Sequence, residues 1–116
     1  MITPIETANE IANDIKELKI LYRDLESFAI RKANGLGNYR KAIQEESLKL
    51  KSDGMSISLI KDVARGNCYK QAIERDLSAS LYQIQNTKID IKKACMNGVQ
   101  SINRGLIHCE KQGYQS

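Results

Sequence analysis

Apolar side chains recur in the first part of this chain at alternating steps of three and four residues: Ala8, Ile11, Ile15, Leu18, Tyr22, Leu25 and Ala29. The same spacing returns in the last part, where Lys88 and Gly98 occupy two of the slots: Leu77, Leu81, Ile84, Ile91, Cys95, Ile102 and Leu106. Residues three and four apart lie on the same face of an α-helix, so each series forms one apolar stripe. Two long stripes in a short chain have each other as the obvious partner, and the pattern predicts a seam between two helices.

The fold class that this pattern predicts is all-α: an elongated antiparallel helical hairpin, coiled-coil-like, with a short helix at the turn. A chain of 116 residues has the length of one domain. We expect residues 1–116 to form a single helical domain, with a long arm over about 4–51, a short helix over about 56–65, a long arm over about 67–109 and a frayed tail over 110–116. Apolar residues make up 41% of the chain, yet it has one Phe and no Trp. This composition favours a thin aliphatic seam over a compact aromatic core.

Local signals mark where the first helix begins and ends. Thr3 can cap a helix that starts at Pro4, and Glu6 occupies the position from which a carboxylate reaches back in a capping box. Gly54 suits the left-handed conformation that follows many helices. Ser56 then offers an N-cap for the short helix at the turn.

The segment Asn34–Asn38 holds two glycines and two asparagines. Together these residues weaken a helix by about 2 to 3 kcal/mol relative to alanine. Leu36, Tyr39 and Ile43 nevertheless continue the apolar series from Ala29 without a change of phase. We therefore expect one long helix with a weak point here, and the alternative is two separate helices.

The inventory of reactive side chains argues against an enzyme. The three cysteines, Cys68, Cys95 and Cys109, lack the spacing of a disulfide framework or a zinc ribbon. His108 is the one histidine and stands beside Cys109. Neighbouring side chains on a helix point about 100° apart, so this pair does not form a thiolate and imidazole dyad. We expect no catalytic site, no cofactor and no metal site.

No segment approaches the roughly 18 to 20 consecutive apolar residues that a membrane-spanning helix needs. The first residues, Met1–Pro4, lack the basic and apolar regions of a signal peptide. We expect a cytoplasmic protein without membrane contact.

Positive charge gathers in the middle of the chain. The net charge is +4, and residues 31–70 carry nine bases against four acids. In a helical hairpin this section forms the tip, where lysines and arginines can contact phosphates while a tyrosine stacks on a base. The candidates for nucleic-acid contact are Arg31, Lys32, Tyr39, Arg40, Lys41, Lys61, Arg65, Tyr69 and Lys70. The alternative is that these side chains are solvated helix faces that keep the chain in solution.

A thin seam buries little surface per residue, so we expect the chain to gain stability from a second copy or from a protein partner. The residues assigned to the helical seam and to oligomerisation are Ile11, Ile15, Leu18, Tyr22, Leu25, Leu77, Leu81, Ile84, Ile91 and Ile102. Lys88 interrupts the second stripe. It either extends its charged end to solvent or acts as the polar residue that sets register and oligomer state.

Short motifs follow one another along the chain: Tyr39-Arg40-Lys41-Ala42, Lys51-Ser52-Asp53-Gly54, Ala64-Arg65-Gly66, and an arm that contains Arg75-Asp76-Leu77 and Tyr82. Their order, over about residues 15–106, resembles that of small uncharacterised helical accessory proteins of phages and prophages. The resemblance implies a noncatalytic accessory protein of a mobile element, located in the host cell cytoplasm, with no catalytic residues. The segment 34–37 departs from that pattern.

We expect a noncatalytic interaction protein that binds another protein, associates with itself, or does both through its helical seams. One alternative is a nucleic-acid-binding accessory factor that uses the basic residues 31–70. A third is an inhibitor of a host nucleic-acid-processing or defence enzyme, with which the acidic outer face of residues 6–24 is compatible.

Overall fold

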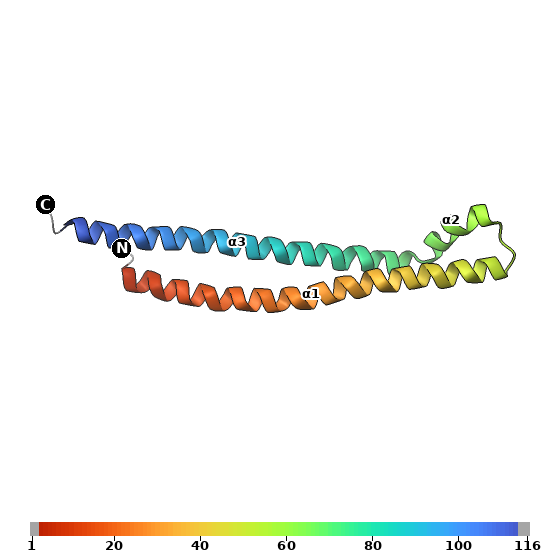
Figure 1. Cartoon of the computed structure of the whole chain (residues 1–116), viewed down its shortest axis with the longest axis horizontal. Coiled ribbons are helices and arrows are strands. Elements are labelled where there is room, and N and C mark those ends of the chain that lie inside the picture. Colours follow the sequence, from red (N-terminus) through yellow and green to blue (C-terminus); the bar gives the residue numbers. More distant parts are fainter. Residues whose placement is uncertain (1–2, 114–116) are drawn as a thin grey trace. The chain divides into compact units, whose positions relative to one another are not determined.

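The computed structural model describes the backbone of residues 3–113 and the side chains of residues 3–98. Within these residues the protein is all-α, as predicted, with three helices: α1 (Pro4–Ser52), α2 (Ile57–Asn67) and α3 (Tyr69–Gly113) (Figure 1). The predicted ranges were about 4–51, 56–65 and 67–109. Helix α3 extends to Gly113, so it includes four residues of the predicted frayed tail, and the last three residues lie outside the described part.

The predicted capping box opens α1. The Thr3 N–H donates to Glu6 Oε2 at 3.1 Å, and the Glu6 N–H donates to Thr3 Oγ1 at 3.2 Å. Two backbone donors that have no partner within the helix are thereby satisfied. The helix begins at Pro4, where the missing N–H costs nothing.

Helix α1 runs without interruption through Asn34–Asn38, so it is one long helix at this point. It ends in a Schellman motif. Gly54 has φ +85°, its N–H donates to the Lys51 carbonyl, and the Met55 N–H donates to the Leu50 carbonyl. The prediction that Gly54 takes a left-handed conformation is confirmed.

Ser56 precedes α2, as predicted, but its hydroxyl caps nothing and instead lies 3.0 Å from the Ser58 hydroxyl. At the other end of α2 the Cys68 N–H donates to the Ala64 carbonyl, and the Cys68 carbonyl accepts from Ala72 in α3. A single residue therefore separates the two helices. Ala64 and Cys68 are buried.

The chain divides into two compact units: one comprises Met1–Leu25 with Gln85–Ser116, and the other comprises Glu26–Ile84. In the first unit, α1 and α3 pair antiparallel. Gln85 Nε2 donates to the Leu21 carbonyl at 2.9 Å, and Lys92 Nζ donates to Asp14 Oδ1 at 2.7 Å.

The second unit also pairs α1 with α3 and adds α2. Arg31 of α1 meets Glu74 of α3 at 2.9 Å. Glu46, fifteen residues further along α1, accepts a hydrogen bond from Asn67 at the end of α2. The order of these contacts again runs antiparallel. Leu50 is buried together with Ala64 and Cys68.

The seam of α3 lies one residue further along the chain than the apolar stripe predicts. Six buried or half-buried side chains of α3 follow steps of three and four: Ser78, Tyr82, Gln85, Ile89, Lys92 and Met96. Ala79, Leu81 and Asn86 beside them are also half-buried. Each of the six directly follows a slot of the predicted stripe, the slot before Ile89 being the one that Lys88 interrupts, and one residue corresponds to about 100° around a helix. Leu77, Ile84 and Ile91 are exposed as a result.

On α1 the seam shares some positions with the predicted stripe and departs from it at others. Ile11, Leu18 and Leu25 are half-buried, whereas Ile15 and Tyr22 are exposed. The half-buried residues that replace the last two at the seam are Asp14 and Leu21. At Asp14 the physical reason is polar pairing, since its carboxylate accepts a hydrogen bond from Lys92 of α3.

Candidate interaction surfaces

A line of largely exposed aliphatic side chains follows α3 in the second unit. Ile73 is 61% exposed, Leu77 46% and Ile84 51%, and Leu81 between them is half-buried. These four residues, here named the α3 outer stripe, follow steps of four, four and three, so they share one face of the helix. Three of them were predicted to lie in the seam: Leu77 and Ile84 are exposed, whereas Leu81 is half-buried.

In the first unit, the predicted seam residue Ile91 is exposed, and so are Lys88 and Cys95. Lys88 therefore has its charged end in solvent and does not enter the seam. The predicted seam residue Ile102 lies outside the residues whose side chains the structure describes.

Three of the predicted nucleic-acid contacts are engaged within the second unit. Arg31 forms a two-pronged ion pair with Glu74, Nε to Oε1 at 2.9 Å and Nη2 to Oε2 at 3.3 Å. The Lys32 ammonium lies 4.8 Å from the centre of the Tyr82 ring. The Arg75 guanidinium covers the Tyr39 ring at 4.1 Å, so this face of Tyr39 does not stack on a base.

The other predicted contacts remain at the surface. Arg40, Lys70 and Tyr69 are exposed, and Lys41 makes a long ion pair of 3.9 Å with Glu45. The structure brings only two of the nine candidates together at one site. Lys61 and Arg65 both line a groove between the end of α1 and α2.

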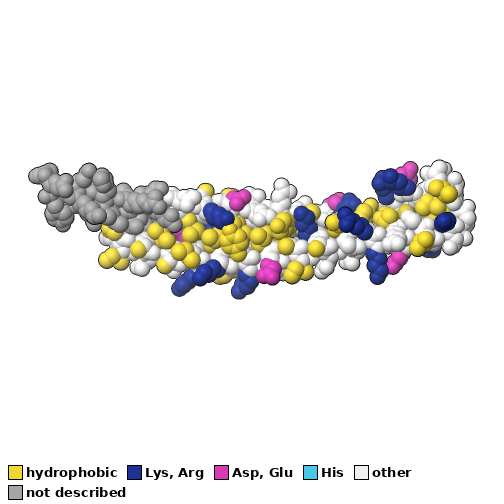
Figure 2. Space-filling model, in the orientation of Figure 1, with side chains coloured by type: hydrophobic (Ala, Val, Ile, Leu, Met, Phe, Trp, Pro, Cys, Tyr) yellow, Lys and Arg dark blue, Asp and Glu magenta, His cyan; other side chains and the backbone are white. Residues whose placement is uncertain are grey.

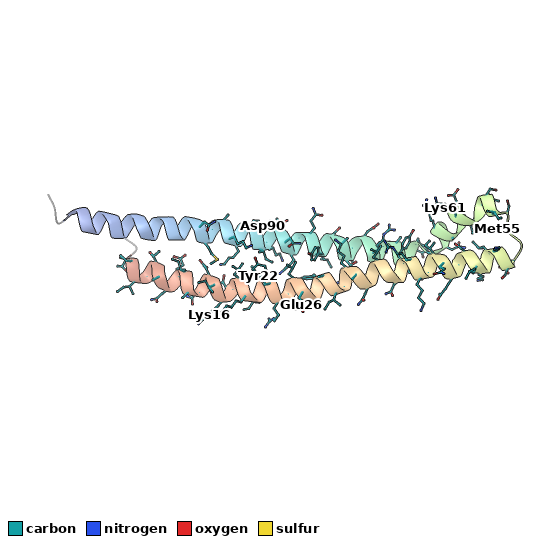
Figure 3. All side chains as sticks on the ribbon, viewed as in Figure 1. Lys16, Tyr22, Glu26, Met55, Lys61 and Asp90 are labelled. Atoms are coloured by element: carbon teal, nitrogen blue, oxygen red, sulfur yellow. The ribbon has the colours of Figure 1, made fainter. Side chains whose placement is uncertain are left out.

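This α1–α2 groove lies wholly within the second unit and has a volume of about 460 Å³. Its apolar lining comes from both helices: Ile43, Leu48, Ile57 and Ile60. Its basic side chains are Lys51, Lys61 and Arg65. Over α2, Figure 2 shows hydrophobic and basic side chains close to one another at the surface, and Figure 3 labels Lys61 on this helix.

Charged groups also enter the seam of the first unit. Lys92 donates to Asp14 and to Glu17, and these hydrogen bonds raise the pKa of Lys92 well above its usual range. The Lys93 ammonium lies 5.2 Å from the centre of the Tyr22 ring, and hydrogen bonding with the Tyr22 side chain raises the pKa of Lys93. In Figure 3, Tyr22 is on the side of α1 that faces α3. The α1–α3 contact of this unit is therefore partly electrostatic.

Burial raises the pKa of the Cys68 thiol, and the nearby Glu46 carboxylate adds to the effect. This cysteine is therefore a small packed side chain and a poor nucleophile at neutral pH. In the part of the chain that the structure describes, no group of three or more His, Cys, Asp or Glu side chains is arranged to hold a metal ion. His108 and Cys109 lie beyond the described side chains.

Two features of these surfaces were not predicted from the sequence. Ile73 was absent from the predicted stripe because it follows Tyr69 and precedes Leu77 at steps of four, outside the alternating pattern. The groove is the second feature: it is lined by Leu48 of α1 and Ile57 of α2, two residues that the turn between these helices brings together. The apolar face of the short helix was the one signal that indicated a neighbour there.

Among the helices that the structure describes, none combines the length and the apolar composition needed to cross a lipid bilayer.

Comparisons of this chain with protein-family models, with curated proteins and with solved structures found no match.

Proposed function

We propose that this chain is a noncatalytic interaction protein that associates with itself through the α3 outer stripe. The observation that supports this function is the exposure of Ile73, Leu77 and Ile84 on a helix that buries Ser78 and Gln85 instead. Full burial of an Ile or Leu side chain stabilises by about 1.5 to 3 kcal/mol. A partner that covers the stripe therefore gains several kcal/mol.

A second copy fits the stripe because the stripe is uncharged. Antiparallel pairing of two such stripes places aliphatic side chains opposite one another, with no like charges in contact. The same patch then serves both copies, as in most closed dimers. The nearby charges of Arg31 and Glu74 satisfy each other across the α1–α3 pair.

The test is the molecular mass in solution. Sedimentation equilibrium of the full chain should give a mass at least twice the 13.1 kDa of one chain. A variant with Ile73→Lys and Ile84→Lys should sediment as a monomer, because each substitution places a cation in the contact. Both residues are exposed, so circular dichroism should show unchanged helix content.

The matched control replaces two exposed isoleucines of α1, Ile20→Lys with Ile30→Lys, and should keep the mass of the parent. A strictly monomeric parent, or equal loss of association in both variants, contradicts the proposal.

We further propose that the whole chain is one elongated antiparallel hairpin. Two observations support it: α1 and α3 are each continuous, and they pair antiparallel in each unit. A straight helix of 49 residues is about 75 Å long. Small-angle X-ray scattering of the monomeric variant should give a maximum dimension of at least this size, and a value near half of it contradicts the hairpin.

A further inference from the structure

The α1–α2 groove has an apolar surface that the second unit leaves open to solvent. Ile57, at the first position of α2, is 82% exposed, and Leu48 on the opposite helix is 60% exposed. Both line the same groove, and exposed apolar patches rimmed by polar residues mark interaction sites. A volume of about 460 Å³ falls in the range of sites that bind a ligand.

Three basic side chains line the groove. In the described part of the chain, no ion pair joins Lys51, Lys61 or Arg65 to a carboxylate. By contrast, Glu46 of α1 is occupied by the Asn67 side chain. The groove therefore offers three cations next to its apolar lining.

The arrangement of these cations follows the two helices. Lys61 and Arg65 are four residues apart on α2, so they stand on one face, about 6 Å apart along the helix axis. Lys51 belongs to the last turn of α1. Positive charge is thus spread along the groove and is not gathered at one point.

We propose that the α1–α2 groove binds an acidic amphipathic helix of a partner protein. The aliphatic side chains of the partner helix pack against the apolar lining of the groove. Carboxylates spaced by four residues on the same helix pair with Lys61 and Arg65. An open channel between two helices suits a third helix. The positive charge of the groove is complementary to the negative charge of a helix with glutamates along one edge.

Nucleic acid suits the groove less well. A single strand is held by base stacking on aromatic rings as well as by cations, and none of the lining residues is aromatic. The surface is also separate from the α3 outer stripe, so one chain can bind a second copy and a partner helix at different places.

The experiment uses a fluorescein-labelled peptide of about five helical turns. Leucines form one face, glutamates recur every fourth residue along its edge, and alanine fills the rest. Its twin carries lysine in place of each glutamate. Fluorescence anisotropy with the full chain should show saturable binding of the glutamate peptide and at least about tenfold weaker binding of the lysine peptide.

Charge reversal at the groove, Lys61→Glu with Arg65→Glu, should weaken binding of the glutamate peptide by about tenfold or more. Reversal of two exposed cations elsewhere in the second unit, Arg40→Glu with Lys70→Glu, changes the net charge equally and should leave binding within about twofold. Ile57→Ser tests the apolar lining and should also weaken binding, without loss of helix, because Ile57 is exposed.

Three results overturn the proposal: no saturable binding of the glutamate peptide at about 1 mM, equal losses in the two charge-reversal variants, or displacement of the peptide by a random single-stranded oligonucleotide whose own binding depends on Lys61 and Arg65. The third result, displacement by the oligonucleotide, would show that the groove binds nucleic acid. Repeating the titration with the Ile73→Lys, Ile84→Lys variant separates this site from self-association, because peptide binding should persist in it.

Discussion

At Gly35 the two long helices of the second unit come closer together than a larger residue allows. A Cβ atom placed there would lie 2.7 Å from Ser78 Oγ and 3.4 Å from the Arg75 Cα. Ser78 is fully buried, and its hydroxyl donates to the Arg75 carbonyl at 3.0 Å. Gly35 weakens α1 as a helix former, but it permits the close packing of α1 on α3.

Gly37 provides a matched comparison, because a Cβ atom there would meet nothing within 4 Å. Gly37→Ala should stabilise the chain by about 1 kcal/mol through helix propensity. Gly35→Ala brings the same propensity gain together with overpacking, which costs about 1 to 3 kcal/mol. Urea unfolding followed by circular dichroism should therefore find Gly35→Ala less stable than Gly37→Ala by about 1 to 3 kcal/mol.

Ser78→Ala removes the oxygen atom that the new Cβ would meet. In the Gly35→Ala background it should recover most of the lost stability, although Ser78→Ala alone brings no such gain. Equal effects of the two glycine substitutions would show that α1 and α3 do not approach closely at Gly35.

At the scale of the helix, the sequence predicts where α1 begins and ends more reliably than which face it buries. Thr3, Glu6 and Gly54 act on the backbone next to them, so local chemistry is enough to place the helix ends. The buried face depends on a partner that lies up to 78 residues away in the sequence, as Asp14 and Lys92 do. In a sequence, a lysine or an aspartate indicates an exposed position. Only the partner that neutralises its charge shows that the position can be buried.

The same reasoning explains the one-residue shift on α3. Leu77 and Ile84 are the better hydrophobic residues, and a pattern based on hydrophobicity selects them. The structure buries Ser78 and Gln85, because Ser78 fits against Gly35 and Gln85 binds the Leu21 carbonyl. Neither contact leaves a signal in the periodicity of one helix.

The ion pair between Arg31 and Glu74 links α1 to α3 in the second unit and should make stability depend on pH. Hydrogen bonding to Arg31 lowers the pKa of Glu74 from its ordinary value of 4.5. A carboxyl group whose pKa is lower in the folded state stabilises the fold above its unfolded pKa, and this contribution is lost as the pH falls through the folded pKa.

Glu74→Gln should therefore lower the thermal unfolding midpoint at neutral pH and have little effect well below pH 4.5, where Glu74 is protonated. Glu26→Gln is the control, since Glu26 is exposed and has no ion pair in the described part of the chain. Circular dichroism melts across this pH range measure both. A Glu74→Gln deficit that stays constant down to acid pH would rule out the ion pair as its cause.

At the scale of the whole molecule, the all-α class and the order of a long, a short and a long helix follow from the sequence, because Pro4, Gly54 and the heptad spacing are local features. The two candidate interaction surfaces cannot be predicted from the sequence in the same way. Leu77, Leu81 and Ile84 of the α3 outer stripe were expected inside the seam, and the α1–α2 groove exists only once the turn brings Leu48 and Ile57 onto the same surface. Both belong to the second unit, on different helices.

The polar seam of the first unit limits how far its two helices can slide past each other. A seam of Leu and Ile alone presents the same kind of side chain after a shift of one heptad, whereas a polar residue in the seam specifies the register. A shift of this kind, about 10 Å, would take Lys92 away from Asp14 and Gln85 away from the Leu21 carbonyl. The side chains of Lys92, Asp14, Glu17 and Gln85 would then each lose a hydrogen-bond partner, so slippage is costly in this unit.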